Sequence, residues 1–298
     1  MAAALETAAA APTLPRRRRG SRRLRPLILY PATALLAFLF LFPFLWSLFS
    51  SFKTPQDMYA YPPVIIPSVW KLDNYVDIFA AAPFATWYKN TLVIVALATS
   101  GTVITATVVA YGFARFEFRF KNFLFMLTLA TLMLPSYVSL IPRYILFYQL
   151  GMVNTFYPLW LPTWFGGGAF AIFLMRQFLL TLPRELDEAA VIDGASYFRI
   201  LWEILVPLCK PALATLAILT ILANWESFLD PVIFLQSTDQ FTIAVGLNYF
   251  KAVPDVSGRP TDQLLMAAAM TSVLPPILLF FSFQRYFVQG IVLSGLKE

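Results

Sequence analysis

Residues 185–207 read ELDEAAVIDGASYFRILWEILVP, a charged stretch in an otherwise strongly apolar chain. It contains five of the sixteen acidic residues of the chain: Glu185, Asp187, Glu188, Asp193 and Glu203. Thr181 and Pro183 suit a helix start, and acidic residues in the first turns complement the positive end of the helix dipole. Gly194 interrupts the helix at a cost of about 1 kcal/mol relative to Ala. Residues 181–207 are therefore predicted to form a short helix, a bend and a second helix.

The composition indicates an integral membrane protein. Of the 298 residues, 59% are hydrophobic and 13% are charged, and the mean hydropathy is +0.70. Soluble globular chains are nearer 45–50% apolar and about 25% charged. The chain has no histidine and a single cysteine, Cys209, which excludes histidine acid–base catalysis and an internal disulfide and disfavours a zinc site. We expect no metal site and no catalytic residues.

Uncharged runs long enough to cross a bilayer predict six spans. They lie at residues 26–52, 90–114 and 122–142, within the long run 144–175, and at 211–236 and 263–284. The fourth predicted span contains WFGGGAF, in which Gly166–Gly168 allow close packing or local unwinding, with packing favoured. The predicted fold is an all-α membrane protein.

Lysine and arginine residues are distributed unevenly between the two sides. Seven of the 22 lie in the first 25 residues, and the apolar run after Arg25 is too long for a signal peptide. We expect residues 1–26 to form a basic, disordered tail. With this tail in the cytoplasm, 16 lysine and arginine residues lie inside and six outside. Both termini and residues 181–207 are then cytoplasmic, and the charge of +6 indicates topology rather than nucleic-acid binding.

The small face of this cytoplasmic segment, formed by Ala189, Ala190 and Ala195, suits close docking of another surface. A helix lying on lipid is the alternative, but such helices are usually basic on their polar face. The acidic first half favours a basic protein partner. The chain contains no GxxxxGK[ST] motif and is therefore not itself a P-loop ATPase, so its energy must come from a partner or from an ion gradient.

The spacing in this segment resembles the EAA loop of ABC importer permeases. Glu188-Ala189-Ala190 is followed after three residues by Gly194 and after nine more by Ile204-Leu205-Val206-Pro207, where the family has leucine in place of Val206. Further stretches are similar to the carbohydrate branch of the maltose type: SFKTPQDMYAYPP, AYGFARFEFRFKN, LMLPSYVSLIPRYILFYQLGMVNT and QRYFVQGIVLSGLKE. The resemblance covers about residues 27–298.

The resemblance implies a type I ABC importer permease fold of six transmembrane helices with a cytoplasmic coupling helix. Such a permease is not an enzyme, and ATP and magnesium bind to separate ATPase subunits. The implied partners are a second permease, two ATPase subunits, an extracytoplasmic solute-binding protein, a sugar or polyol phosphate, and the lipid of a bacterial or archaeal plasma membrane. The implied ATPase-coupling residues are Glu188, Ala189, Ala190, Asp193, Gly194, Ala195 and Pro207.

Two further groups of residues are weaker candidates. Sugar sites combine aromatic platforms with polar side chains, which makes Asn224, Trp225, Glu226 and Phe228 candidates for the substrate pathway. By resemblance, the outer loop 247–262 probes the binding protein, with Tyr249, Pro254 and Gly258 as docking residues.

An ion-coupled secondary transporter is the alternative function. Charged residues inside a membrane are usually functional, and Glu226 and Asp230 are four residues apart, as on one helix face.

Overall fold

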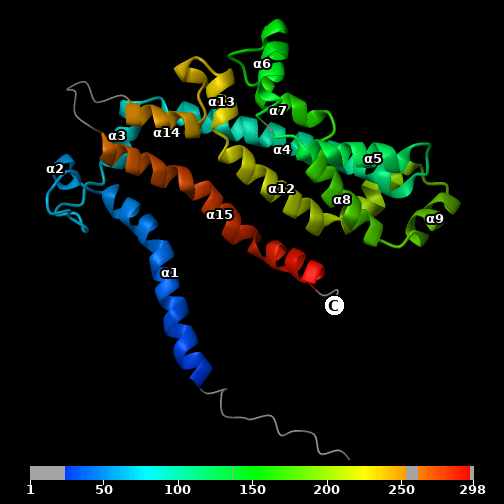
Figure 1. Ribbon diagram of the computed structural model, residues 1–298, viewed down its shortest axis with the longest axis horizontal. Helices are drawn as coiled ribbons and strands as arrows, with labels where there is room; N and C mark the ends of the chain where they lie inside the picture. The colour runs from blue at the N-terminus through cyan, green and yellow to red at the C-terminus, as the bar shows by residue number, and fades with distance from the viewer. Residues whose placement is uncertain (1–23, 136, 253–260, 296–298) are drawn as a thin grey trace, which may run out of the picture. The chain divides into compact units, whose positions relative to one another are not determined.

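The computed structural model describes residues 24–135, 137–252 and 261–295, and over these residues it is helical without a strand (Figure 1). The basic tail predicted for residues 1–26 lies almost entirely outside them. Contacts divide the chain into two units, residues 1–47 and residues 48–298. The first unit contains most of α1 (Leu24–Ser50), and every residue from 29 to 44 is exposed. An apolar helix with no buried face needs lipid or another protein around it.

Among the described residues, between four and six segments are long and apolar enough to cross a membrane, and the upper number equals the six predicted spans. Four helical segments are long and apolar enough by themselves: Leu29–Ser50, Phe84–Arg115, Tyr157–Thr181 and Asp262–Phe283. Two bent helix pairs raise the number to six: Lys121–Met133 with Tyr137–Gln149, and Tyr197–Leu208 with Lys210–Trp225.

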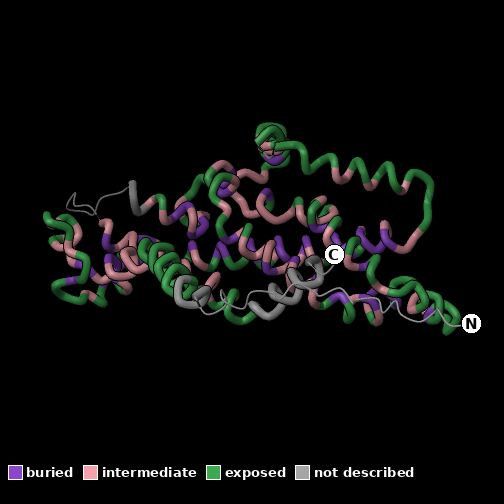
Figure 2. The backbone as a smooth tube through the Cα atoms, turned by 60° about the horizontal axis from the view of Figure 1, so that its bottom comes forward, coloured by how far each residue is buried: buried purple, intermediate pink, exposed green. Residues whose placement is uncertain are grey.

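The second unit is built around α4 (Phe84–Arg115), which packs against α8 (Ala169–Thr181) and α12 (Lys210–Trp225). Small residues recur on α4 at every fourth position, and all of them are buried: Ala98, Thr102, Ala106, Ala110 and Ala114. Residues four apart share a helix face, and small ones let two membrane helices approach closely. Many of the buried residues lie on these three helices, and Figure 2 shows buried positions along the interior of the unit.

Short helices gather at the end of this unit where α4 and α15 begin. They are α2 (Pro55–Met58), α3 (Asn74–Ala81), α13 (Leu229–Phe234), η5 (Thr238–Gln240) and α14 (Ile243–Ala252). Of these, α2, α3 and α14 contact α15 (Asp262–Gly295), while α3, α14 and η5 contact α4. A second buried core, which includes Trp87, Trp225 and Ile243, holds this end together.

The third predicted span is not one straight helix. α5 (Lys121–Ala130) continues into the short η2 (Thr131–Met133), and α6 (Leu140–Gln149) begins after a break. Pro135 lies in this break. Proline disfavours a helical conformation in the residue before it and cannot donate a backbone hydrogen bond, which accounts for the interruption.

WFGGGAF lies within the fourth span, Tyr157–Thr181, and of the two roles predicted for its glycines the local unwinding is present. α7 (Tyr157–Trp160) and η3 (Leu161–Trp164) precede the glycines, and α8 follows them. Gly166, Gly167 and Gly168 all have positive φ angles, so the chain unwinds here. The packing role is present as well, because a Cβ on Gly167 would lie 2.6 Å from the Thr102 carbonyl oxygen and 2.7 Å from the Ala106 side chain.

Candidate functional site

The predicted helix–bend–helix is present at one end of the second unit, and its two arms meet at Gly194. α9 (Glu185–Ile192) is followed by Asp193 and then by Gly194, which has a φ of +79°. The Gly194 amide donates to the Val191 carbonyl at 3.0 Å, and the Ala195 amide donates to the Ala190 carbonyl at 2.9 Å. These two bonds form a Schellman motif, which needs a left-handed residue after the helix and therefore favours glycine.

The start of α9 differs from the prediction. Thr181 is the last residue of α8, and α9 begins at Glu185 behind Arg184, whose side chain makes no capping hydrogen bond. The first turn instead contains Glu185, Asp187 and Glu188. Each acidic residue near the positive end of a helix contributes about 0.3–1 kcal/mol, so charge rather than a hydroxyl cap stabilises this end.

The second arm consists of α10 (Tyr197–Arg199), the π-helical η4 (Ile200–Leu205) and α11 (Val206–Leu208). The Ser196 side chain caps it by accepting a hydrogen bond from the Arg199 amide at 3.3 Å. The Val206 amide bonds five residues back, to the Leu201 carbonyl, just before Pro207. The arm meets α12 at 81°, so it runs across that helix instead of extending it.

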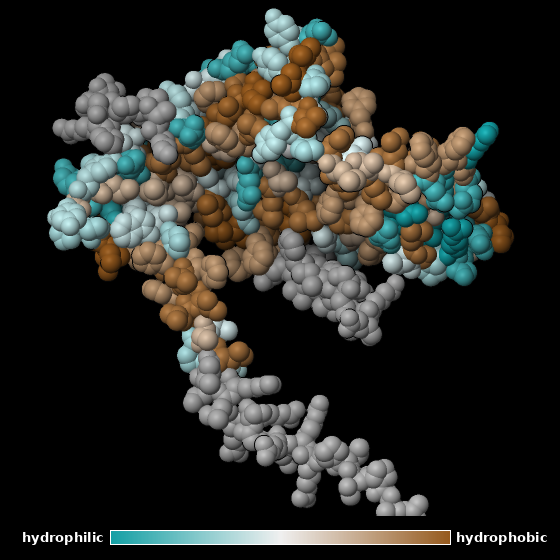
Figure 3. All heavy atoms as spheres, in the orientation of Figure 1, coloured by the Kyte–Doolittle hydropathy of each residue, from teal (hydrophilic) through white to brown (hydrophobic). Residues whose placement is uncertain are grey.

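Residues 185–208 have a buried base and an exposed tip. Ala190, Ile200, Leu201 and Leu205 belong to one buried core with residues of α4, α8 and α12. Around the bend, by contrast, large apolar side chains are open, with Ile192 86% and Phe198 72% exposed. Figure 3 shows hydrophilic residues gathered at this end, beside apolar ones. An anchored segment with an exposed apolar tip and acidic flanks is suited to binding another protein.

The predicted coupling residues fall into three groups by burial. Five are exposed: Glu188, Ala189, Asp193, Gly194 and Pro207. Ala195 is half-buried and Ala190 is buried. The expectation that all three alanines present one open small face is therefore wrong, because Ala190 packs into the core and only Ala189 is fully available to a partner.

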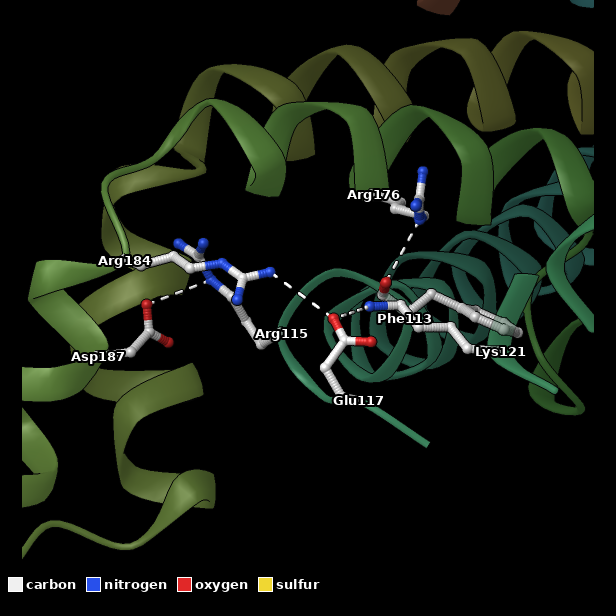
Figure 4. A network of polar contacts seen from close by, with 7 residues as sticks. All are labelled: Phe113, Arg115, Glu117, Lys121, Arg176, Arg184 and Asp187. Atoms are coloured by element: carbon white, nitrogen blue, oxygen red, sulfur yellow. Dashed lines mark hydrogen bonds and ion pairs between the residues drawn. The ribbon is translucent and has the colours of Figure 1, made fainter. Parts of the chain in front are cut away.

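Polar contacts fasten α9 to the neighbouring helices (Figure 4). Arg115, the last residue of α4, places its Nε 3.2 Å from Asp187 Oδ2 and donates from Nη2 to the Leu182 carbonyl at 3.1 Å. The side chains are only 6% and 18% exposed. Burial raises the pKa of the Asp187 carboxyl, and the positive charge of Arg115 opposes that rise. A carboxylate buried here depends on the arginine for compensation.

The outer part of the same network is weaker. Glu117 Oε1 lies 3.0 Å from Lys121 Nζ and 3.9 Å from Arg184 Nη2, and the Glu117 side chain is 74% exposed. Exposed ion pairs of this kind contribute little to stability, because water and salt screen them. Arg176 donates to the Phe113 carbonyl at 3.3 Å and lies 4.2 Å from the Phe125 ring centroid, which fastens α8 to α4 and α5.

The predicted pathway residues lie where α12 ends. Glu226 terminates α12, residues 226–228 are not helical, and α13 starts at Leu229. The interpretation that Glu226 and Asp230 share one helix face is therefore wrong. Asp230 instead forms an ion pair with Arg143 of α6. Among the described residues, Glu226 makes no ion pair, and its side chain is exposed.

The other members of this group have different surroundings. Trp225 is 7% exposed and donates its indole N–H to the Ser272 carbonyl at 3.2 Å, so it packs against α15. Asn224 donates to the Thr220 carbonyl at 2.8 Å and lines a polar cavity of about 30 Å³. Phe228 is 42% exposed next to Glu226. Glu226 and Phe228 are thus the two pathway candidates that present an open carboxylate and an open ring.

The predicted docking loop is only partly described. Tyr249 is half-buried, with its ring 5.9 Å from Trp87 in an edge contact. Pro254 and Gly258 lie outside the described residues.

The helical architecture and the anchored bend can be compared with known proteins. Residues 103–293 match the family described as "Binding-protein-dependent transport system inner membrane component". The chain belongs to this family. It is thus a permease subunit of an ATP-driven, binding-protein-dependent importer, and the alternative of an ion-coupled secondary transporter is wrong.

Relatives of the permease match it over nearly their whole length. The arabinooligosaccharides transport system permease protein AraQ of Halalkalibacterium halodurans is 35% identical over 267 residues, 89% of this chain and 94% of that protein. The lactose transport system permease protein LacG of Rhizobium radiobacter is 30% identical over 271 residues, 91% and 96% of the two chains. The sn-glycerol-3-phosphate permease UgpE of Yersinia enterocolitica is 33% identical over 261 residues, 85% and 91%.

A solved structure shares the fold. A chain from a bacterial ABC transporter involved in the import of the acidic polysaccharide alginate superposes with a TM-score of 0.81 at 21% identity, covering 93% of the permease and all of that chain. The predicted fold class, an all-α importer permease, is confirmed.

Sequence reasoning missed Arg115 and the small-residue face of α4. The signal for the face was present, since alanine or threonine recurs at every fourth position from Ala98 to Ala114. Arg115 lies inside the stretch AYGFARFEFRFKN, where it was counted only as a cytoplasmic charge. Its contact with Asp187 joins residues 72 positions apart in the chain, a pairing that one sequence does not reveal.

Proposed function

We propose that the permease imports a neutral sugar or oligosaccharide, that it forms half of a translocation pathway with a second permease, and that residues 185–208, the coupling loop, bind one of two cytoplasmic ATPase subunits. A solute-binding protein delivers the cargo on the opposite side. ATP and magnesium belong to the ATPase subunits. In this arrangement both termini and the coupling loop lie in the cytoplasm of a bacterial or archaeal cell.

The coupling role rests on one observation: an exposed apolar tip, Ile192 and Phe198, is held on a base that is buried in the core of α4, α8 and α12. A partner that grips the tip can move these helices because the base is packed into them. The exposed acids Glu188 and Asp193 favour a basic cleft on that partner. Asp187 is excluded from this role because it faces Arg115.

The substrate class rests on the names of the relatives and on the charges at the α12–α13 break. AraQ and LacG are named for arabinooligosaccharides and lactose, and UgpE for a phosphate ester. Asp230 and Arg143 neutralise each other, which among the described residues leaves the Glu226 carboxylate without an ion pair at the break. A charged side chain facing lipid is costly, so Glu226 faces water or the second permease. An unpaired carboxylate accepts hydrogen bonds from sugar hydroxyls and repels a phosphate.

Replacement of Gly194 tests the coupling role. In the assembled complex, Gly194→Trp should abolish uptake and lower the amount of ATPase that co-purifies, with the permease still in the membrane. Gly151→Trp is the matched control, because Gly151 is also exposed, has a φ of +67° and has open space around it. Normal uptake in Gly194→Trp would contradict the proposal.

Uptake measurements test the substrate class, in cells that lack the permease and in the same cells complemented with it. Labelled arabinotriose, lactose and glycerol 3-phosphate are offered in parallel. We expect uptake of a neutral saccharide and none of the phosphate ester. Uptake of glycerol 3-phosphate in preference to both saccharides would contradict the charge argument.

A further inference from the structure

The end of α4 touches the coupling loop on both sides of its bend. Before the bend, Arg115 of α4 lies against Asp187 of α9, with 3.2 Å between Nε and Oδ2. After the bend, Tyr197 of α10 packs edge-on against Phe116, the residue that follows α4, with ring centroids 4.9 Å apart. Phe116 in turn packs on Tyr111 of α4 at 5.2 Å. The two arms of the loop are therefore clamped to one helix end.

The first of these contacts is electrostatic and shielded from solvent. Both side chains are largely buried, and the same guanidinium also holds the Leu182 carbonyl in the link between α8 and α9. The loop's other ion pair, Arg199 with Glu203, is within the second arm and 65% and 61% exposed. Breaking a buried pair is far more costly than breaking an exposed one, because the remaining charge has no water around it.

The opposite end of α4 holds a different part of the chain by hydrogen bonds. Trp87 donates its indole N–H to the Thr238 carbonyl at 2.7 Å. Asn90 donates to the carbonyls of Asp239 at 2.8 Å and Phe241 at 3.0 Å. Thr91 Oγ1 accepts the Ile243 amide at 2.8 Å. Residues 238–243 are thus fixed to the first two turns of α4.

Between these ends α4 is unbroken. Its 32 residues contain no proline, and at 1.5 Å per residue they span about 48 Å. The two other helices in the loop's core are interrupted: α8 starts after the glycines 166–168, and α12 joins the loop through the 81° bend and stops at Trp225. An intact helix moves as a rigid rod, so a displacement at one end reaches the other.

We propose that Arg115 and Asp187 are positioning residues that fix the coupling loop to α4, so that movement of the loop is delivered to residues 238–243 at the far end of that helix. This inference rests on the proposed coupling role of the loop. It adds a specific path: the ATPase pulls α9, Asp187 pulls Arg115, and α4 moves the segment that leads into α14. Neither residue is needed for binding the ATPase, since both are turned away from the exposed tip.

Hydrogen exchange in the complete complex, with both permeases, both ATPase subunits and the binding protein in lipid nanodiscs, tests this path. ATP with vanadate is the probe. In the wild type, trapping should change the exchange of residues 185–208 and of residues 238–252. In Asp187→Asn, which keeps the side-chain volume, and in Arg115→Met, the change at 185–208 should persist. The change at 238–252 should fall about tenfold, as expected for a loss of about 1.4 kcal/mol of coupling.

The control is Arg199→Gln, which removes the exposed pair of the same loop and should leave both responses as in the wild type. A normal response at 238–252 in Asp187→Asn would overturn the proposal. Loss of the ATPase from the Asp187→Asn complex would also overturn it, because Asp187 would then act in docking. If the wild-type loop itself shows no response, the coupling role fails, and the two failures are thereby distinguished.

Discussion

The Arg115 guanidinium joins three helices at one point, with Asp187 of α9 at 3.2 Å and the Leu182 carbonyl, which follows α8, at 3.1 Å. α9 is only eight residues long and presents its tip to the outside. A helix this short is marginal in water by itself. The attachment to α4 therefore gives the coupling loop the rigidity that a mechanical link requires.

The glycines between η3 and α8 differ in how much room they have, which allows a matched comparison. Gly167 and Gly168 both have positive φ angles, but only Gly167 contacts α4, whereas a Cβ on Gly168 would meet nothing within 4 Å. Gly168→Ala carries the backbone cost alone, about 1–3 kcal/mol, because its φ of 92° and ψ of 150° lie in a region open essentially to glycine. Gly167→Ala adds overpacking, about 1–3 kcal/mol more. Thermal unfolding in detergent should show the larger drop for Gly167→Ala, and equal drops would disprove the close approach.

The hydrogen bonds of Asn90 predict local loosening without global unfolding. Asn90→Ala removes two bonds to the segment 238–243, each contributing about 1 kcal/mol. Exchange of the amides at 238–243 should accelerate by roughly thirtyfold, as expected for a loss of about 2 kcal/mol, and exchange at 185–208 should stay unchanged. Lys89→Ala at the neighbouring exposed position serves as the control. Equal effects of the two variants would show that Asn90 does not hold this segment.

Asp57 should remain charged to unusually low pH. The Ser68 hydroxyl and amide donate to its carboxylate at 2.6–3.0 Å, and these bonds lower its pKa below the usual range. A lowered pKa in the folded state means that the contact stabilises the loop above the unfolded-state pKa and is lost as the pH falls through the folded-state value. NMR of protein labelled at its aspartate carboxyls, with Asp57→Asn for assignment, gives this pKa. Ser68→Ala should raise it, and an unchanged titration would refute the assignment.

The two acids near the α12–α13 break should respond differently to neutralisation. Asp230→Asn leaves Arg143 without its partner and should lower the melting temperature by a few degrees, because that pair is only 30–37% exposed. Glu226→Gln should leave the melting temperature unchanged and lower the uptake of saccharide. Neither variant should make uptake depend on a proton gradient. Proton-gradient dependence in either variant would revive an ion-coupled mechanism.

Much of the fold could be predicted from the sequence because long apolar runs report directly on membrane spans. The direction of the spans, inferred from lysine and arginine counts, stays a prediction. The bend at Gly194 was predictable for a similar reason: few residues other than glycine adopt its positive φ. The kink within the third apolar run was predictable from Pro135, because proline removes a backbone donor and disfavours a helical residue before it, and the break between α5 and α6 lies at this proline.

The pairing of side chains could not be obtained in this way. Glu226 and Asp230 have helical spacing, yet the helix ends between them and Asp230 turns to Arg143, 87 residues away in the chain. Ala190 and Ala189 are equally small, and only packing against the core distinguishes the buried one from the open one. Which charge faces which partner is decided by tertiary contacts that a single sequence does not contain.

The central claim is that the tip of the coupling loop binds the ATPase, and photo-crosslinking from position 192 tests it most directly. Ile192 is 86% exposed and is replaced by a photoreactive amino acid in the assembled complex, with position 148, a 68% exposed tyrosine on α6, as the control. We predict a crosslink from position 192 to the ATPase subunit and none from position 148. A crosslink from position 192 to lipid alone would contradict the account.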